Sequence, residues 1–222
     1  MCIRDSYTTV SRWVRDMVWR VVKYLKNVGM RGIGRLSSTD EVVEEVMGKG
    51  SCVATVSDYE TRFCLAIQVS PTKDGQNSAG LFRAAREMTG CDPLITRSDS
   101  LEAISSGYEE VFGNNLCAIL VRDAHIRNQR RTNNRHERFN STLRGLFGGR
   151  RGRLTEAVIM IAWLFYNCLR PHMSLGEITP AEKAGMFISG PDKMTTLIQN
   201  AAMSGMELPQ PQWTESLSLI HI

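Results

Sequence analysis

The sequence predicts an α/β fold in which a mixed β-sheet is flanked by helices. Two observations carry this prediction. Three short strand-like runs come early in the chain and are separated by tight turns. Segments whose apolar residues recur at three-to-four spacing then alternate with two further short apolar runs, as helices alternate with strands. At 222 residues, the chain is long enough to bury one sizeable core.

The first predicted element is a helix over residues 7–27, because its apolar residues recur every three or four positions. Arg12 and Arg15 lie among the basic residues that fill its other faces. The short polar residues and arginines at its start also resemble the second helix of a helix-turn-helix, which reads a DNA major groove. Residues 29–35 contain three glycines and are typical of a linker. We therefore predict a partial helix-turn-helix DNA-binding segment and linker over residues 7–35.

The remaining regular pattern spans residues 36–188. Strands are predicted at residues 38–47, 51–56, 62–70, 93–96 and 116–121. Helices are predicted at residues 76–89, 101–112, 135–147 and 154–169, with a short last helix opened by Thr179 and Pro180. The order β-β-β-α-β-α-β-α is the arrangement of the ribonuclease H-like fold. Residues 189–222, where the pattern fades into Gly, Pro and Ser, are predicted to form an irregular C-terminal tail.

Charge is distributed unevenly along the chain, whose net charge is +4. Residues 1–35 hold eight Lys and Arg against two acids, and residues 122–153 hold ten against two. Residues 36–121 reverse the balance, with thirteen acids against six bases. Two basic segments around an acidic centre suit a protein that holds a polyanion and carries out metal chemistry on it. No apolar run approaches the roughly 20 residues that a membrane helix needs, so no membrane partner is expected.

Both ends of the chain, residues 1–6 and 217–222, look like translated sequencing-adapter read-through. We therefore expect the natural N-terminus to be missing. The six cysteines form no C-x-x-C pair, and none of the four histidines pairs with them at zinc-ligand spacing, which argues against a zinc site. All but Cys2 lie in apolar surroundings, which predicts buried free thiols in a reducing compartment.

Three carboxylates mark a candidate metal site. Asp40 lies in the first predicted strand, Asp99 follows the fourth, and Glu137 lies on the helix after the fifth. Residues at strand ends of an open α/β sheet face a shared crevice, and carboxylates gathered there repel one another unless cations neutralise them. Oxygen ligands and a phosphate substrate favour Mg²⁺ or Mn²⁺. Taken singly, each acid is better explained as a surface residue, and Glu137 as a salt-bridge partner; their joint order favours the metal site. Asp58 is interpreted as a turn residue.

Four stretches of the chain resemble the catalytic part of DDE-type insertion-sequence transposases, in the retroviral integrase-like superfamily. They are residues 38–43, 56–63, 133–144 and 166–182. The last two stretches are the specific ones, and the resemblance spans residues 7–188. It implies a ribonuclease H-like catalytic domain over residues 36–188. Its expected activity is metal-dependent DNA cleavage at the ends of an insertion sequence, followed by strand transfer from the freed 3′-hydroxyl.

The resemblance assigns Asp40 the role of the family's first catalytic aspartate and Glu137 that of its glutamate. The family usually has its second aspartate directly after the strand, but here Arg97 stands in that position. Asp99 fits this role if Arg97-Ser98 is a two-residue insertion; otherwise the position holds Arg97 and the site lacks one ligand. The implied cofactor is Mg²⁺ or Mn²⁺, bound by Asp40, Asp99 and Glu137.

The expected partners are double-stranded DNA, at the element ends and the target, and further copies of the chain in a homodimer or higher assembly. Contacts to the DNA are expected from Arg12, Arg15, Arg130, Arg131, Asn134, Arg135, Arg138 and Arg144. Asn140 is interpreted as a phosphate contact or a brace for Glu137. Arg170 and His172 could contact DNA or close a helix by hydrogen bonds, and the structural role is favoured. The resemblance implies a prokaryotic, cytoplasmic, nucleoid-associated protein. Two alternatives stay open: an inactive transposase relic that only binds DNA, and a ribonuclease H-like nuclease acting on hybrids.

Overall fold

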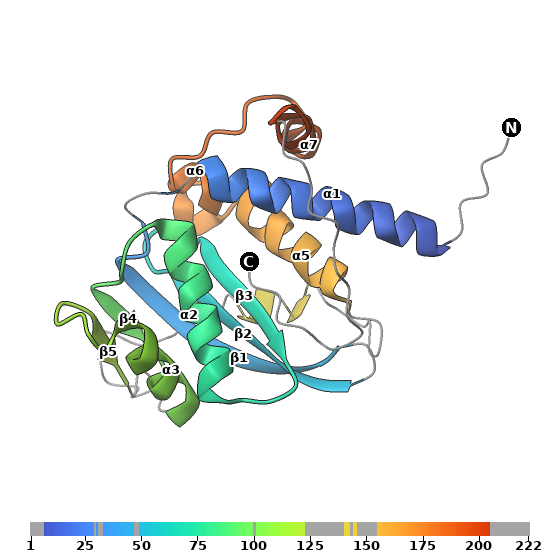
Figure 1. Cartoon of the computed structure of the whole chain (residues 1–222). Helices are drawn as coiled ribbons and strands as arrows, with labels where there is room; N and C mark the ends of the chain where they lie inside the picture. Colours follow the sequence, from blue (N-terminus) through green and yellow to red (C-terminus); the bar gives the residue numbers. More distant parts are fainter. Residues whose placement is uncertain are drawn as a thin grey trace, which may run out of the picture.

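The computed structural model describes residues 7–28, 30, 33–46, 49–99, 101–122, 140–142, 144–145 and 155–204 (Figure 1). The strands are β1 (Leu36–Val46), β2 (Lys49–Asp58), β3 (Cys64–Ser70), β4 (Ile95–Arg97) and β5 (Ile119–Val121). The α-helices are α1 (Tyr7–Val28), α2 (Gly75–Thr89), α3 (Glu102–Phe112), α5 (Glu156–Leu164), α6 (Pro180–Lys183) and α7 (Lys193–Met203). A π-helix, η1 (Phe165–Leu169), continues α5, and a 3₁₀ turn, η2 (Met173–Leu175), follows.

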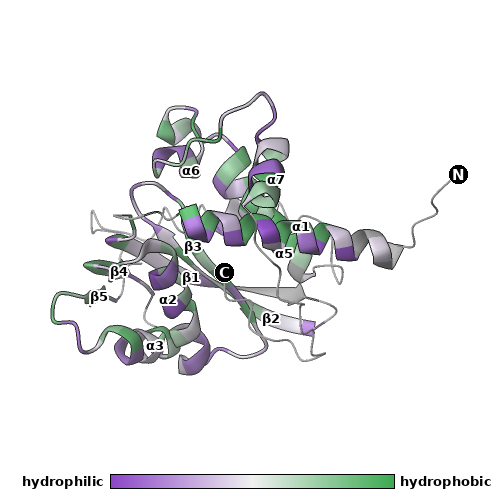
Figure 2. Cartoon of the chain, turned by 45° about the horizontal axis from the view of Figure 1, so that its top comes forward, coloured by the Kyte–Doolittle hydropathy of each residue, from purple (hydrophilic) through white to green (hydrophobic). Residues whose placement is uncertain are grey.

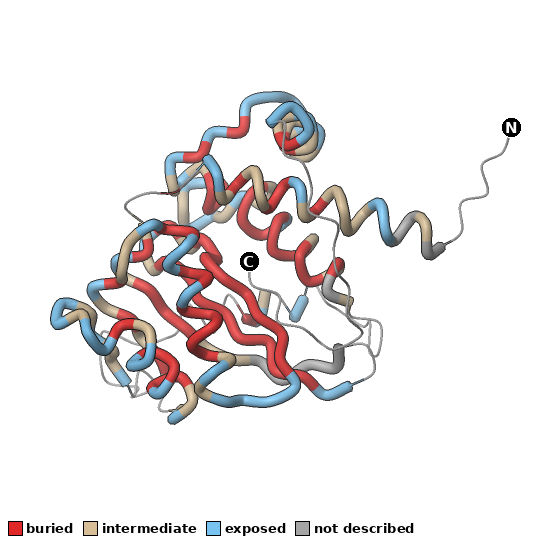
Figure 3. Tube along the Cα trace, in the orientation of Figure 1, coloured by how far each residue is buried: buried red, intermediate tan, exposed pale blue. Residues whose placement is uncertain are grey.

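The strands form one mixed sheet in the order β3-β2-β1-β4-β5. β1, β2 and β3 make the predicted antiparallel meander, and β4 and β5 run parallel to β1. This arrangement confirms the predicted α/β class and its ribonuclease H-like order of elements. β3 and the part of β2 next to it are buried along their length, so this side of the sheet is covered on both faces (Figure 3).

α2 and α3 cover one face of the sheet (Figure 1). α2 begins at Asp74, whose side chain caps the helix. α3 crosses α2 closely at Gly107, where a Cβ atom would lie 2.5 Å from the backbone nitrogen of Ala79. Next to this crossing, the rings of Phe82 and Tyr108 meet edge-to-face with centroids 5.3 Å apart. The two helices are therefore packed by one small residue and a cluster of aromatic rings.

α5 and η1 pack against the start of β3. Trp163 donates its indole N–H to the carbonyl of Cys64 at 2.8 Å. The side chain of Asn167 accepts from the N–H of Cys64 at 2.8 Å and donates to its carbonyl at 3.1 Å. Both side chains are fully buried, and Figure 2 shows α5 as an almost wholly apolar helix. Because helix side chains satisfy the main chain of a strand, they fix α5 and η1 relative to the sheet.

The C-terminal half of α1 belongs to the same core and packs against α5 and α7. Its fully buried residues are Val18, Val21, Val22 and Leu25. The N-terminal half projects from the body of the molecule (Figure 1), with Arg12 and Trp13 exposed. None of the described helices is long and apolar enough to cross a membrane. The helix-turn-helix interpretation and the boundary at residue 35 stay predictions.

Three expectations about individual elements are corrected. Residues 193–203, within the predicted irregular tail, form α7, because Asp192 caps its first turn and Leu197 is fully buried. The last strand is shorter than residues 116–121, since the chain before Ile119 forms turns. For the same reason Cys117 is exposed rather than buried, whereas Cys52, Cys64 and Cys168 are buried free thiols as predicted. The predicted helix over residues 154–169 ends as the π-helix η1.

Candidate active site

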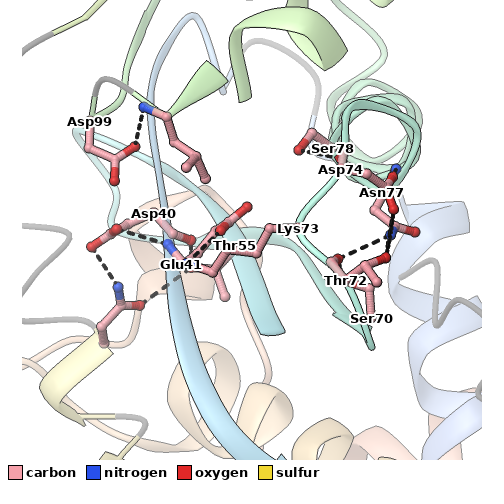
Figure 4. A network of polar contacts seen from close by, with 12 residues as sticks. Asp40, Glu41, Thr55, Ser70, Thr72, Lys73, Asp74, Asn77, Ser78 and Asp99 are labelled. Atoms are coloured by element: carbon pink, nitrogen blue, oxygen red, sulfur yellow. Dashed lines mark hydrogen bonds and ion pairs between the residues drawn. The ribbon is translucent and has the colours of Figure 1, made fainter. Parts of the chain in front are cut away.

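The parallel pairing of β1 with β4 brings Asp40 and Asp99 level with one another. Leu36 pairs with Ile95, and the whole pairing keeps this offset of 59 residues (95 − 36). Asp40 and Asp99 are separated by the same interval (99 − 40), and Asp99 lies two residues beyond the end of β4. Figure 4 shows the side chain of Asp40, within β1, and that of Asp99, just beyond β4, with the carboxylate of Asp99 directed toward Asp40. The two predicted aspartates therefore follow, at the same offset, the last paired residues of β1 and β4.

Arg97 lies at a different level of the sheet. It pairs with Ser38, and its guanidinium carbon is 4.2 Å from the centroid of the Tyr59 ring, in the turn after β2. The backbone N–H of Tyr59 donates to the carbonyl of Leu36 at 2.6 Å, at the start of β1. Stacking on this ring holds the guanidinium by a cation–π contact. Arg97 is thus paired two residues before Asp40, and the assignment of Asp99 as the second catalytic aspartate stays a prediction.

Two hydrogen bonds orient the carboxylate of Asp40. Its Oδ2 accepts from Nδ2 of Asn140 at 2.8 Å, and its Oδ1 accepts from the backbone N–H of Glu41 at 2.8 Å. Asn140 is buried, and its Oδ1 also accepts from the hydroxyl of Thr55 on β2 at 3.4 Å. Hydrogen bonds to a carboxylate are stronger than neutral ones. One amide side chain therefore links a helical segment to both β1 and β2.

Asn140 comes from the helix predicted over residues 135–147. The structure describes residues 140–142, 144 and 145 of it, and all of them are helical. The sequence interpretation expected Asn140 to contact phosphate or to brace Glu137, and the structure instead has it brace Asp40. Outside the described residues lie Glu137, Arg130, Arg131, Asn134, Arg135 and Arg138.

The three predicted DNA-binding arginines that the structure describes lie on two helices. Arg12 and Arg15 lie on α1, where Arg12 is exposed and Arg15 is half-buried. Arg144 is exposed and follows Asn140 by four residues. Residues four apart in a helix share a face, so Arg144 lies on the side of its helix that also carries the contact to Asp40.

An ion pair that the sequence analysis missed lies beside Asp40, on the other face of β1. The Nζ atom of Lys73 is 3.1 Å from Oε2 of Glu41, whose side chain is 4% exposed against 40% for Lys73 (Figure 4). Burial lowers the pKa of Lys73, but the hydrogen bond and charge of Glu41 outweigh it, and the charge of Asp99 also acts to raise it. Lys73 is therefore a cation that pairs with Glu41 and that the charge of Asp99 also reaches. No sequence signal pointed to it, because its partner lies 32 residues away (73 − 41) on another strand.

The loop that carries Lys73 is held by a network of polar contacts (Figure 4). Ser70 donates its hydroxyl to the carbonyl of Thr72 at 2.8 Å, and the hydroxyl of Thr72 donates to Asp74 at 2.7 Å. The side-chain amide of Asn77 donates to Asp74 at 2.8 Å. Burial raises the pKa of the thiol of Cys52, near Glu41, to about 12, and the charge of Glu41 adds to this shift. The pair of Lys73 with Glu41 is thus built on a fixed loop and a buried carboxylate.

The carboxylates at this edge suit a hard divalent cation. Asp40 and Asp99 offer only oxygen donors, and Oδ2 of Asp99 accepts no hydrogen bond from the described residues. Oxygen donors without nitrogen or sulfur fit Mg²⁺ or Mn²⁺ better than zinc. Within the described ranges, no three His, Cys, Asp or Glu side chains form a metal-binding group. The assignment of Asp40 and Asp99 as metal ligands stays a prediction.

His172 has a structural role. Its backbone N–H donates to the carbonyl of Ile178 at 3.0 Å, and its ring meets that of Tyr166 edge-to-face at 4.7 Å. Burial lowers the pKa of the imidazole, and the positive charges of Arg170 and Arg62 lower it further. These contacts confirm the interpretation of His172 as a residue that closes the segment after η1.

Asp58 is a buried turn residue, as the sequence indicated. Its Oδ1 accepts from the N–H of Gly34 at 2.7 Å. Its Oδ2 accepts from both the N–H and the hydroxyl of Thr61, each at 2.7 Å. With both oxygens bonded to the protein, Asp58 fixes the turn after β2 to the chain that enters β1.

No protein-family model and no curated protein matches the chain. Among solved structures, it is similar to the HTLV-2 integrase catalytic core domain in complex with magnesium, with 15% identity, a TM-score of 0.55, and coverage of 68% of this chain and 97% of that one. The BIV integrase catalytic core gives 16% identity and a TM-score of 0.54, covering 67% of this chain and 92% of that one. A chain of the simian T-cell lymphotropic virus intasome in complex with PP2A regulatory subunit B56 gamma gives 14% identity and a TM-score of 0.59, over 72% of this chain and 58% of that chain. The protein therefore has the ribonuclease H-like fold of retroviral integrase cores.

Proposed function

We propose that this protein is a DDE-type transposase, a polynucleotidyl transferase that cleaves DNA at the ends of an insertion sequence and joins the freed 3′ ends to a target. The observation that carries the proposal is the parallel pairing of β1 with β4, whose offset of 59 residues is also the interval between Asp40 and Asp99. The likeness of the fold to integrase catalytic cores supports it by analogy.

The proposed metal ligands are Asp40, Asp99 and Glu137, with Mg²⁺ or Mn²⁺ as the cofactor. When bound, the ions would activate the attacking oxygen and stabilise the leaving oxygen of an in-line displacement. Asn140 and the N–H of Glu41 hold the carboxylate of Asp40 in one orientation, which is the support that a metal ligand needs. Glu137 precedes Asn140 by three residues, so on a continuous helix the two side chains would share the face toward Asp40.

The proposed reaction has two displacements at phosphorus. In the first, the oxygen of a water molecule attacks the scissile phosphate and the bond to the 3′-oxygen breaks, leaving a 3′-hydroxyl and a 5′-phosphate. In the second, the oxygen of that 3′-hydroxyl attacks a phosphate of the target strand, and the target's own 3′-oxygen leaves with a proton. The second step conserves the number of phosphodiester bonds, so no further energy source is required.

The proposed DNA contacts come from basic residues on both sides of the acidic centre. They are Arg12, Arg15, Arg130, Arg131, Asn134, Arg135, Arg138 and Arg144. Lys73 adds a cation beside the aspartates. Arginines that neutralise phosphates bind with a strong salt dependence and without reading sequence. Because the reaction joins two element ends, we also propose a homodimer or larger assembly on DNA.

The test is nicking, in Mg²⁺, of a supercoiled plasmid that carries the DNA flanking this reading frame. We expect the wild type to nick it, and D40N and D99N to reduce nicking to background. R97Q should keep activity, because its guanidinium stacks on Tyr59 instead of facing the aspartates. E60Q is the matched control, since Glu60 is an exposed acid in the turn after β2.

Two outcomes would contradict the proposal. If D40N nicks as fast as the wild type, the activity does not come from this site. If the wild type binds the plasmid but leaves it intact in both Mg²⁺ and Mn²⁺, the chain is a DNA-binding relic. An RNA–DNA hybrid is tested in parallel. If the protein cuts the hybrid in preference to the plasmid, it is a ribonuclease H-like nuclease and not a transposase.

A further inference from the structure

A groove lies between the helical segment that contains Asn140 and the π-helix η1. Its volume is about 510 Å³, and its described lining consists of Ser141, Thr142, Gly145, Phe165 and Arg170. Ser141 directly follows Asn140, which donates to Asp40. One wall of the groove therefore belongs to the segment that braces the first aspartate.

Phe165, the aromatic residue that lines this groove, is more exposed than its neighbours in the helix. Phe165 is 38% exposed, whereas its neighbours Leu164 and Tyr166 are buried. The carbonyl of Phe165 accepts from the N–H of Arg170 at 2.8 Å, the bond five residues apart that defines a π-turn. Such turns are rare and occur frequently at functional sites. The ring of Phe165 is thus turned out of the core that α5 otherwise fills and lines the groove.

The positive charge of this groove has no counter-charge in the described part of the chain. The Arg170 side chain makes no hydrogen bond or ion pair with any described residue. The charges that reach its neighbour His172 are also positive, because both Arg170 and Arg62 lower the pKa of that imidazole after burial. A guanidinium without a carboxylate, next to two hydroxyl-bearing residues, is suited to bind an anionic oxygen such as a phosphate.

We propose that this groove binds one nucleotide of single-stranded DNA, with its phosphate on Arg170 and its base stacked on Phe165. A cation that follows the backbone and an aromatic ring that stacks a base are the two parts of single-strand binding sites. The base has to be unpaired, because in a duplex both of its faces are already stacked. The inference rests on the proposed function and adds to it a site for a strand that has left the duplex.

The test is binding without chemistry, by fluorescence anisotropy in EDTA, so that it does not depend on nicking. The probes are a labelled oligothymidylate and an abasic strand of the same length. We expect F165L to weaken binding of the oligothymidylate by about 5-fold or more, the smaller end of the range for loss of one stacked base. On the abasic strand F165L should bind like the wild type. F165Y keeps the ring and should bind both strands like the wild type.

R170Q should weaken binding of both strands alike, because it removes a phosphate contact. It should also make the dependence of log K on log[salt] shallower by about 0.7, the contribution of one phosphate on a single strand. The matched controls are F187L, at an exposed phenylalanine between α6 and α7, and R83Q, at an arginine that pairs with Glu110. Both controls should leave binding unchanged.

Several results would overturn the inference. If the melting temperature of F165L falls, the wild type alone decides: equal affinity of the wild type for the oligothymidylate and the abasic strand rules out a stacking site. An equal effect of F165L on both strands, or an unchanged salt slope in R170Q, also overturns it. Failure of nicking with intact binding would instead count against the proposed function and leave the groove standing.

Discussion

The side-chain amide of Asn140 donates to the carboxylate of Asp40 at 2.8 Å, joining a helix and a strand that are 100 residues apart in the sequence. A hydrogen bond to a charged group is worth about 1.5–3 kcal/mol. If this bond orients Asp40 for metal binding, N140A should reduce Mg²⁺-dependent nicking about tenfold or more, since about 1.4 kcal/mol corresponds to a factor of ten.

The control for that variant is N115A. Asn115 donates to Asp92 at 2.8 Å, between the end of α3 and the start of β4, away from the paired aspartates. Both substitutions remove an amide that binds a carboxylate, so both should lower stability to a similar extent. If Asn140 positions Asp40, nicking should fall in N140A only. Equal losses of nicking in the two variants would show that Asn140 contributes to stability alone.

Asn167 should carry a large part of the stability of the contact between η1 and β3. N167L keeps a similar volume but leaves the N–H and the carbonyl of Cys64 without the side chain that bonds both. We expect a loss of about 2–3 kcal/mol in the free energy of unfolding, because the buried N–H of Cys64 loses its side-chain acceptor, whereas its carbonyl keeps the bond from Trp163. This corresponds to a melting temperature about 5–10 °C lower for a domain of this size. Circular dichroism measures it, and N114L, at an exposed asparagine, should change little.

Gly107 should tolerate no side chain. In G107A the added Cβ would meet Ala79 at 2.5 Å and the side chain of Ser78 at 2.6 Å, so α2 and α3 would have to separate. We expect a loss of about 1–3 kcal/mol, the usual cost of overpacking a core. The comparison is G50A, because a Cβ at Gly50 would have nothing within 4 Å. A denaturant midpoint for G107A equal to that of G50A would show that the helices can move apart freely.

Protonation of His172 should lower the stability of the protein at acid pH. Burial and the charges of Arg170 and Arg62 lower the pKa of its imidazole in the folded state from 6.5. The unfolded chain therefore binds this proton at a higher pH than the folded chain does. The stability that depends on neutral His172 is complete above pH 6.5 and is lost as the pH falls through the lower folded pKa.

Denaturant unfolding at a series of pH values between about 7.5 and about 5 measures this effect as a slope in the free energy of unfolding. H172Q should flatten the slope in that window, because glutamine does not titrate. If H172Q keeps the slope of the wild type, the pH dependence comes from other titratable groups.

The sequence by itself determined which elements form and in what order. Hydrophobic periodicity and turn residues are local signals, and they predicted the meander, the two helices after it and the short fourth strand. Thr179 and Pro180 at the start of α6 are another local signal, confirmed by the structure, which adds a reciprocal bond of Thr179 with Glu182 at 2.8 Å and 3.1 Å. Local signals were less reliable at element ends. α7 was missed because its first turn depends on one cap, Asp192, in a stretch rich in Gly, Pro and Ser.

Only the tertiary structure decided which side chains meet. The interval between Asp40 and Asp99 was visible in the sequence, but its meaning depends on the register of β1 with β4, which repeats the same offset of 59 residues. The contacts of Asn140 with Asp40 and of Lys73 with Glu41 join segments that no periodic pattern connects. The physical reason is that strand register and helix docking are set by packing of the whole core. Local propensity determines only that a strand or a helix is present.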